Sequence, residues 1–234
     1  VYKRQAPEVL QDMLEAASRA STCGNMQLYS LIVTQSRELR EALAPCHFNQ
    51  PMVTQAPCVI TVCADVHRFS MWCEQRDAEP CYDNFAWFLN GVTDALLAAQ
   101  NLCVEAEAHG LGICYLGTTI YTAEEIARIL DLPKGVIPVT TIVVGHPDES
   151  PELTDRLPLD AVVHCEKYHH YTSSEIDELW AEKETSEETR RLLEENGLPN
   201  LAQIFTRNRY RAEDNLAISR NYFALLKKQG FFNN

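Results

Sequence analysis

The sequence contains none of the short motifs that identify a common enzyme class. It has no Gly-x-x-x-x-Gly-Lys phosphate loop, no Gly-x-Ser-x-Gly nucleophile turn and no Cys-x-x-Cys pair. Gly110, Gly112 and Gly117 are spaced somewhat like a dinucleotide-binding motif, but they follow an expected helix, whereas that motif follows a strand. Local motifs therefore name no activity.

The chain also lacks long apolar runs and an excess of basic residues. No run approaches the roughly 20 apolar residues that a membrane helix needs, and no signal-like segment follows Val1. Its 20 Lys and Arg face 33 Asp and Glu, a net charge of −13, which disfavours nucleic acid as a partner. We expect a cytoplasmic protein with a small-molecule partner and neither a nucleic-acid nor a membrane role.

The nine cysteines are odd in number and irregularly spaced. Several lie among apolar residues, as Cys58 and Cys63 do, and buried thiols behave as small hydrophobic groups. We therefore expect reduced, structural cysteines and no metal. A small metal-binding protein stays open as an alternative because Cys46-His47 and His164-Cys165 are adjacent pairs of metal-ligating types, although neither has the spaced second half of a zinc site.

Hydrophobic periodicity predicts short strands interleaved with longer helices. The expected strands are Leu28–Thr34, Cys58–Cys63, Ile113–Leu116 and Ile137–Val144, and the expected helices are Pro7–Ala20, Ser36–Ala44, Asp83–His109, Thr122–Leu130 and Leu216–Phe232. Such a pattern indicates an α+β, three-layer sandwich with a small sheet. Charged residues dominate after the core, so we divide the chain into a core, 1–160, and a C-terminal helical extension, 161–234, within the same domain.

The longest expected helix, Asp83–His109, is apolar around a wide arc. A helix with so thin a polar side is usually buried on several sides. We expect it to lie either centrally within the domain or against a second subunit.

Four segments carry a stronger signal through their order and spacing. They are Ala17–Gln27, a helix running into a Ser-rich loop with Asn and Gln; Asn49–Met52, ahead of a buried strand; Ala108–Thr118, with its Gly-Leu-Gly strand entry; and Val144–Pro147 followed by Leu153–Pro158. Together they resemble the nitroreductase family along nearly all of the chain. The C-terminal region is most similar to the branch of oxygen-insensitive NADPH nitroreductases and flavin reductases.

The resemblance implies a homodimeric, FMN-dependent NAD(P)H oxidoreductase with a nitroreductase-like α-β-α sandwich and a small mixed, mainly antiparallel sheet. NADPH or NADH would leave a hydride on the flavin N5, and a small-molecule acceptor such as a nitroaromatic, quinone or flavin would take the electrons. The flavin carries this chemistry, so no catalytic side chain is expected. A non-redox flavin-binding or regulatory protein is the alternative, since it would use the same residues.

The resemblance also implies which residues bind the flavin. They are Ser21, Thr22 and Asn25 near the cofactor, Gln50 and Met52 along its ring and ribityl, the backbone amides of Tyr115, Leu116, Gly117 and Thr118 at the reactive edge, and Arg156 at the phosphate. An arginine fork suits a phosphate better than lysine does. The alternative for Arg156 is a surface salt bridge with Asp155 or Glu152.

Two basic regions bear on the nucleotide ligands. Family members begin with an Arg-Ser-x-Arg segment that binds the phosphate, and Lys3 and Arg4 do not match it. We therefore expect an incomplete N-terminus, which leaves FMN retention by this chain open. Farther on, Arg207, Arg209 and Arg211 form a basic patch that could bind the NADPH 2′-phosphate. The alternative is that they lie on a solvated helix face.

Overall fold

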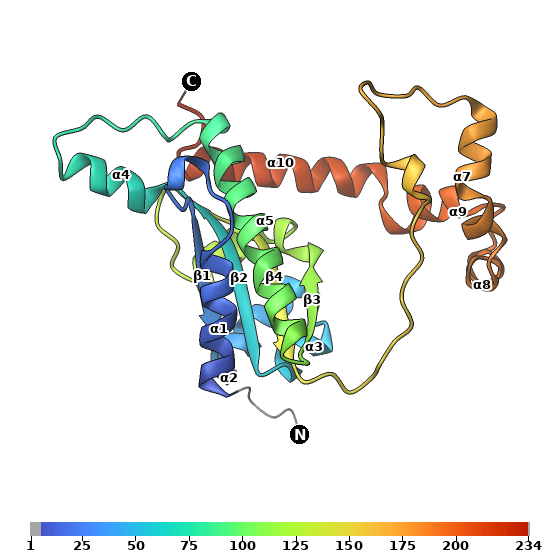
Figure 1. Ribbon diagram of the computed structural model, residues 1–234, viewed down its shortest axis with the longest axis horizontal. Helices are drawn as coiled ribbons and strands as arrows, with labels where there is room; N and C mark the ends of the chain where they lie inside the picture. Colours follow the sequence, from blue (N-terminus) through green and yellow to red (C-terminus); the bar gives the residue numbers. More distant parts are fainter. Residues whose placement is uncertain (1–5, 234) are drawn as a thin grey trace. The chain divides into compact units, whose positions relative to one another are not determined.

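A computed structural model describes residues 6–233 of the chain (Figure 1). These residues form two compact units. One comprises residues 6–148 and 218–233, and the other is Glu149–Ala217. The expected placement of residues 1–160 and 161–234 in one domain stays a prediction.

The first unit is built on a four-stranded sheet of order β1-β2-β4-β3. The strands are β1 (Tyr29–Thr34), β2 (Cys58–Asp65), β3 (Gly112–Leu116) and β4 (Val136–Gly145). The four predicted strands are confirmed to within two residues at each end. Every neighbouring pair is antiparallel, so the expectation of a mixed sheet is wrong for the described residues, because each strand runs opposite to the strands beside it.

Helices cover both faces of this sheet, which confirms an α+β arrangement. The helices of the unit are α1 (Pro7–Ser18), α2 (Arg37–Leu43), α3 (Pro51–Gln55), α4 (His67–Glu74), α5 (Phe85–Ala108), α6 (Ala123–Ile129) and the greater part of α10 (Ala212–Lys228). Helices α1 and α5 lie side by side and bury Ile60 and Val62 of β2 (Figure 1). On the opposite face, α3 packs against Val59 and Val143.

The central strands meet at a bulge where β4 contains Pro138. The register shifts between Val62 and Cys63, so that Val62 pairs with Thr140 and Cys63 with Pro138. Proline has no N–H to donate, and inside a sheet it is confined to edges and bulges. Its carbonyl accepts a hydrogen bond of 3.0 Å from the Tyr222 hydroxyl of α10, which joins this helix to the sheet.

Helix α5 confirms the expected long helix almost residue for residue. Asn84 caps it by accepting a hydrogen bond from the Trp87 N–H at 3.3 Å. Gly91 faces the sheet so closely that a Cβ there would lie 3.1 Å from the Ala64 Cβ and 3.2 Å from the Leu28 carbonyl oxygen. The helix is therefore central in the unit. Its other side exposes large apolar residues, namely Leu89, Leu96, Leu97 and Val104.

The second unit is helical. It contains a 3₁₀ turn (Leu159–Ala161), α7 (Ser173–Thr185), α8 (Glu187–Asn196), α9 (Leu201–Ile204) and a π-helical turn (Phe205–Arg209). Thr172 and Glu175 form a reciprocal capping box at the start of α7. Gly197, with a φ of 62°, ends α8 in the left-handed conformation that glycine adopts most readily. No helix within residues 6–233 is long and apolar enough to span a membrane.

Candidate functional site

The loop between α1 and β1 has an unusual backbone. It contains a 3₁₀ turn (Cys23–Asn25), and Gly24, Asn25 and Gln27 all have positive φ, at 55°, 57° and 49°. Positive φ is uncommon for residues other than glycine. The Gln27 side-chain amide donates to the Asn25 carbonyl oxygen at 2.7 Å and to Asn25 Oδ1 at 2.9 Å, so the exposed part of the loop is ordered by its own side chains.

Beneath this loop lies Asp94 of α5, whose side chain is buried. Its carboxylate accepts hydrogen bonds from the Thr22 hydroxyl at 2.5 Å, the Cys23 N–H at 2.8 Å and the Leu28 N–H at 3.0 Å. Thr22 Oγ1 in turn accepts from the Gln27 N–H at 2.9 Å. Both ends of the loop are therefore attached to one point on α5.

A second irregular segment joins α2 to α3. A 3₁₀ turn (Ala44–His47) is followed by Phe48 and Asn49, both with a φ of 54°. Gln50 then stands at the N-cap of α3, and its carbonyl accepts a hydrogen bond from the Val53 N–H at 3.1 Å. Met52 is half-buried against the apolar cluster that also contains Leu116.

Strand β3 ends in a short 3₁₀ turn. A 3₁₀ turn (Gly117–Ile120) follows Leu116, and its first amides, those of Gly117 and Thr118, have no carbonyl partner within the turn. A Cβ built on Gly117 would meet no described atom within 4 Å. This strap, Leu116–Thr118, thus begins a 3₁₀ turn next to open space at Gly117.

His47 holds the strap from below. Its ring is fully buried, and Nδ1 lies 2.8 Å from Thr118 Oγ1. Nε2 is buried without a hydrogen-bond partner among the described residues. Burial away from water lowers the pKa of His47 to about 4, so the imidazole is neutral near pH 7. A second contact, from the Thr122 hydroxyl to the Cys46 carbonyl oxygen at 2.7 Å, joins the same two segments.

Comparisons with known proteins identify the fold and the family. A model of the Nitroreductase family matches residues 4–146. The chain belongs to the nitroreductase family. It is 32% identical over 164 residues to the FMN reductase (NADPH) of Bacillus subtilis, which covers 69% of this chain and 66% of that protein.

The chain is also similar to two further oxidoreductases, one of them known from its crystal structure. An NADPH-dependent oxidoreductase of Staphylococcus aureus is 34% identical over 171 residues, covering 71% of this chain and 68% of that protein. The crystal structure of a Bacteroides fragilis protein, 48% identical, matches with a TM-score of 0.96 over 99% of this chain and 95% of that one. The predicted family is confirmed.

Within this nitroreductase-family chain, the predicted flavin residues of the first unit fall into two groups. Gln50, Met52, Leu116, Gly117 and Thr118 belong to neighbouring segments, joined by His47. Ser21, Thr22 and Asn25 precede β1, which is the opposite edge strand from β3. Three strand spacings of about 4.8 Å place the two edges roughly 14 Å apart. One chain therefore does not bring both groups into contact.

The side chain of Tyr115 belongs to neither of these two groups. Its hydroxyl approaches Gln100 Oε1 of α5 at 3.4 Å, on the sheet face opposite to α3. Burial is the main cause of the raised pKa of this phenol, followed by its hydrogen bond with Cys103. Only the backbone of Tyr115 stays a candidate for flavin contact.

Arg156 belongs to the second unit. Its guanidinium donates to Thr154 Oγ1 at 2.6 Å and to the Asp155 carbonyl oxygen at 2.8 Å. Asp155 pairs with Lys183 at 2.7 Å, and the described residues include no ion pair between Arg156 and either Asp155 or Glu152. A phosphate contact for Arg156 stays a prediction. Lys3 and Arg4 lie outside the described residues.

The three arginines of the basic patch, Arg207, Arg209 and Arg211, make different contacts. Arg211 pairs with Glu213 at 2.7 Å, and the guanidinium of Arg209 lies 5.5 Å from the centre of the Phe205 ring. No ion pair of Arg207 occurs among residues 6–233. The π-helical turn that carries Arg207 is a rare form that occurs frequently at functional sites.

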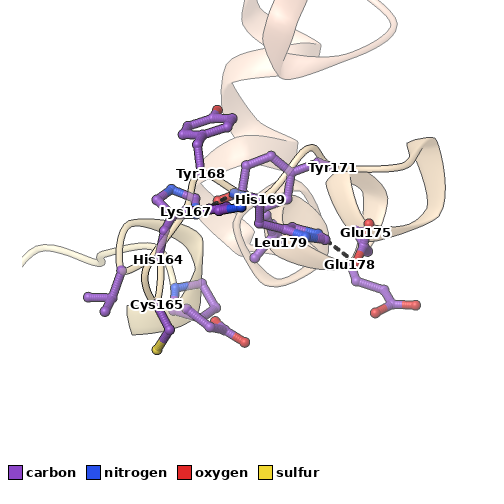
Figure 2. A pocket seen from close by; sticks show the side chains of 12 residues that line it. His164, Cys165, Lys167, Tyr168, His169, Tyr171, Glu175, Glu178 and Leu179 are labelled. Carbon is purple, nitrogen blue, oxygen red and sulfur yellow. Dashed lines mark hydrogen bonds and ion pairs between the residues drawn. The ribbon is translucent and has the colours of Figure 1, made fainter.

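The second unit also contains a cavity of about 700 Å³ (Figure 2). Inside it, His164 Nδ1 accepts from the His169 N–H at 3.2 Å, and His169 Nε2 lies 3.0 Å from Glu175 Oε1. Each contact engages one ring nitrogen, Nδ1 of His164 and Nε2 of His169. Across the described residues no three His, Cys, Asp or Glu side chains group into a metal site. The alternative of a metal-binding protein gains no support from this cavity.

Sequence reasoning missed Asp94 and His47. Asp94 belongs to no motif, and His47, one of seven histidines, drew notice only as a possible metal ligand beside Cys46, not as the contact of Thr118. A usable signal existed for Asp94, because it is a lone carboxylate next to Ala95, one turn from Gly91 and Ala98, on a helix face that is otherwise made of apolar residues and glycine. Charged side chains are rarely buried unless they are paired, so a hydrogen-bonding partner for Asp94 could have been sought.

Proposed function

We propose that this chain is an FMN-dependent NAD(P)H oxidoreductase of the nitroreductase type. The observation that carries the proposal is the strap Leu116–Thr118, in which open space lies beside Gly117, the first residue of a 3₁₀ turn, while His47 contacts the Thr118 hydroxyl from behind. The names of the Bacillus and Staphylococcus relatives, an NADPH-dependent FMN reductase and an NADPH-dependent oxidoreductase, support the same activity.

The residues present fit a flavin. Backbone donors that approach a ring edge need a position without a side chain, and Gly117 provides it. The Gly117 and Thr118 amides would donate to the ring edge, while Gln50 and Met52 would lie along the ring and ribityl. A bound FMN supplies hydride transfer from NAD(P)H and reduction of a small-molecule acceptor. The chain itself positions these ligands and supplies no nucleophile.

We further propose that two copies complete each site. The loop carrying Ser21, Thr22 and Asn25 is on the opposite sheet edge from the strap, and in the proposed dimer the loop of one copy would meet the flavin held at the strap of the other. The exposed leucines 89, 96 and 97 of α5, each more than two-fifths exposed, offer an apolar surface for such a contact. Light scattering would give twice the chain mass for the dimer, and a monomer would contradict it.

Two arginines of the second unit complete the proposal. Arg156 is assigned to the flavin phosphate, since its guanidinium contacts only nearby oxygens within the described residues and keeps donors for a ligand. Arg207 is assigned to the 2′-phosphate of NADPH. If R207A left the preference for NADPH over NADH unchanged, the second assignment would fail.

The deciding experiment is a visible absorption spectrum. The protein is incubated with FMN, desalted and then treated anaerobically with NADPH. Flavin bands that remain with the protein and bleach on NADPH addition support the oxidoreductase. Retained flavin that does not bleach supports the non-redox alternative. If no flavin is retained, the same test is repeated with an Arg-Ser-x-Arg segment added before Pro7, and failure there contradicts the proposal.

A further inference from the structure

The carboxylate of Asp94 is an unusual group at its position. It stands in the third turn of α5, among alanines that pack on the sheet, and only 2% of its surface is exposed. Within residues 6–233 no Lys, Arg or His forms an ion pair with it. A buried charge without an ion pair must be compensated by hydrogen bonds.

The compensation comes entirely from the loop before β1. Oδ2 accepts from the Thr22 hydroxyl and the Leu28 N–H, at 2.5 and 3.0 Å, and Oδ1 accepts from the Cys23 N–H at 2.8 Å. Hydrogen bonds to an ionised acceptor are stronger than neutral ones. The carboxylate of Asp94 thus accepts hydrogen bonds from both ends of a single loop, from Thr22 and Cys23 at one end and from Leu28 at the other.

The loop needs such an anchor because its backbone is strained. Asn25 and Gln27 are held at φ values of 57° and 49°, a conformation that persists only where the surroundings impose it. The exposed tip contributes few apolar contacts of its own, since Cys23, Gly24 and Asn25 are exposed or half-buried. Strained backbone fixed from beneath is typical of preorganised ligand loops.

We propose that Asp94 is the positioning residue of this loop, fixing Thr22 and Asn25 in the geometry that contacts the flavin. The inference rests on the proposed function, because the ligand of the loop is the proposed FMN. Asp94 itself touches no ligand. Its effect passes through Thr22, Cys23 and Leu28.

The matched substitution is Asp94→Asn, which keeps the size of the side chain and removes its charge. In either orientation the new amide group faces the N–H of Cys23 or of Leu28, so at least one backbone donor loses its acceptor. Losing a hydrogen bond to a charged group corresponds to roughly a tenfold or greater weakening. We expect D94N to weaken FMN binding by about that factor.

The measurements separate positioning from general stability. Hydrogen exchange of the Cys23 and Leu28 amides in flavin-free protein should accelerate in D94N, and the dissociation constant for FMN should rise in parallel. Thr22→Val should show the same two changes in part, and Thr22→Ser, which restores a hydroxyl, should reverse them. Thr189→Val provides the control, because it removes a buried 2.7 Å hydrogen bond to the Lys183 carbonyl oxygen in the other unit.

The outcomes are distinguishable from failure of the proposed function. If the protein with Asp94 in place binds no FMN, either as it is or with the added Arg-Ser-x-Arg segment, the proposed function is wrong. If it binds FMN and D94N has a lower melting temperature but the same FMN dissociation constant, Asp94 is only structural and the positioning role is overturned. Equal loss of FMN affinity in T189V would overturn it as well.

Discussion

At His47, burial removes the water that would stabilise a charged imidazolium. The unfolded chain protonates this group near its ordinary pKa of 6.5, whereas the folded protein does so at about 4. Between these values the unfolded state binds more protons, so stability falls as the pH decreases. The part of the folding stability that depends on a neutral His47 is fully present above about pH 6.5 and is lost by about pH 4.

We predict a loss of about 2 kcal/mol in the free energy of unfolding between pH 7 and pH 5 from this histidine alone. Urea unfolding at several pH values measures it. His47→Asn is the comparator, because its amide can still reach Thr118 but does not titrate, and the difference between the two proteins isolates the imidazole. Parallel pH profiles would show that the ring is solvated in the native state.

Gly117 allows a sharper test of the strap. A Cβ at this position meets no described atom, and φ lies outside the left-handed region that demands glycine. We predict that Gly117→Val folds with unchanged or slightly higher stability, since losing a glycine restricts the unfolded chain. The same valine would occupy the space next to the flavin edge and weaken FMN binding by at least about tenfold, a loss of 1.4 kcal/mol.

Thermal unfolding and FMN titration together measure the two effects of G117V. Gly117→Ala should have an FMN affinity between that of the unaltered protein and that of G117V. A large drop in melting temperature would mean that protein atoms, and not a ligand, occupy the space beside Gly117.

Among the elements, α5 depends on a close approach to the sheet. Gly→Ala inside a helix normally stabilises by up to about 1 kcal/mol. At Gly91 the new methyl would meet the Ala64 Cβ and the Leu28 carbonyl at 3.1 and 3.2 Å, and both belong to backbone segments of the core that cannot easily move. We predict that G91A destabilises by about 1–2 kcal/mol instead, through overpacking.

Chemical denaturation gives the sign of the G91A effect directly. Because Leu28 also donates its N–H to Asp94, faster exchange of the Leu28 amide should accompany the loss. A stabilised G91A protein would mean that α5 can shift away from the sheet at little expense.

The same elements show what the sequence could predict. Strands β1–β4 and helices α1, α2, α5 and α6 followed from the apolar pattern of the sequence. The helices each turn one side to the core, whereas β2 reads as a continuous apolar run because it is buried on both faces. Helix α4, His67–Glu74, was missed since its eight residues bury only Cys73 and are too few for a helical period to stand out. Helix α3 has five residues, too few for a period to be visible. Its start at Pro51 could have been found from proline's preference for the first turn.

The site was predictable only where family segments mark it. Gly117 and Thr118 stand in such a segment, but their anchor His47 is distant in sequence and becomes their neighbour through packing. Asp94 and Thr22 are separated by 72 positions and meet only when α5 lies on the sheet. Such pairings depend on tertiary structure, which local patterns do not encode.

For the whole molecule, the division of the site between opposite sheet edges leads to a complementation test. One variant, G117V, has a defective strap. The other, carrying Thr22→Val and Asn25→Gly, has a defective loop, and glycine tolerates the positive φ at position 25. We predict that each alone retains little flavin and that each still forms dimers.

Unfolding the two variants together in equal amounts and refolding them should restore function in part. In a two-fold dimer whose sites combine the strap of one copy with the loop of the other, every mixed dimer contains one intact site and one doubly altered site. Random pairing makes half of the dimers mixed, so about a quarter of all sites should bind FMN and react with NADPH. If one copy supplied both groups, no mixed dimer would contain an intact site, and the mixture would be as inactive as its parts.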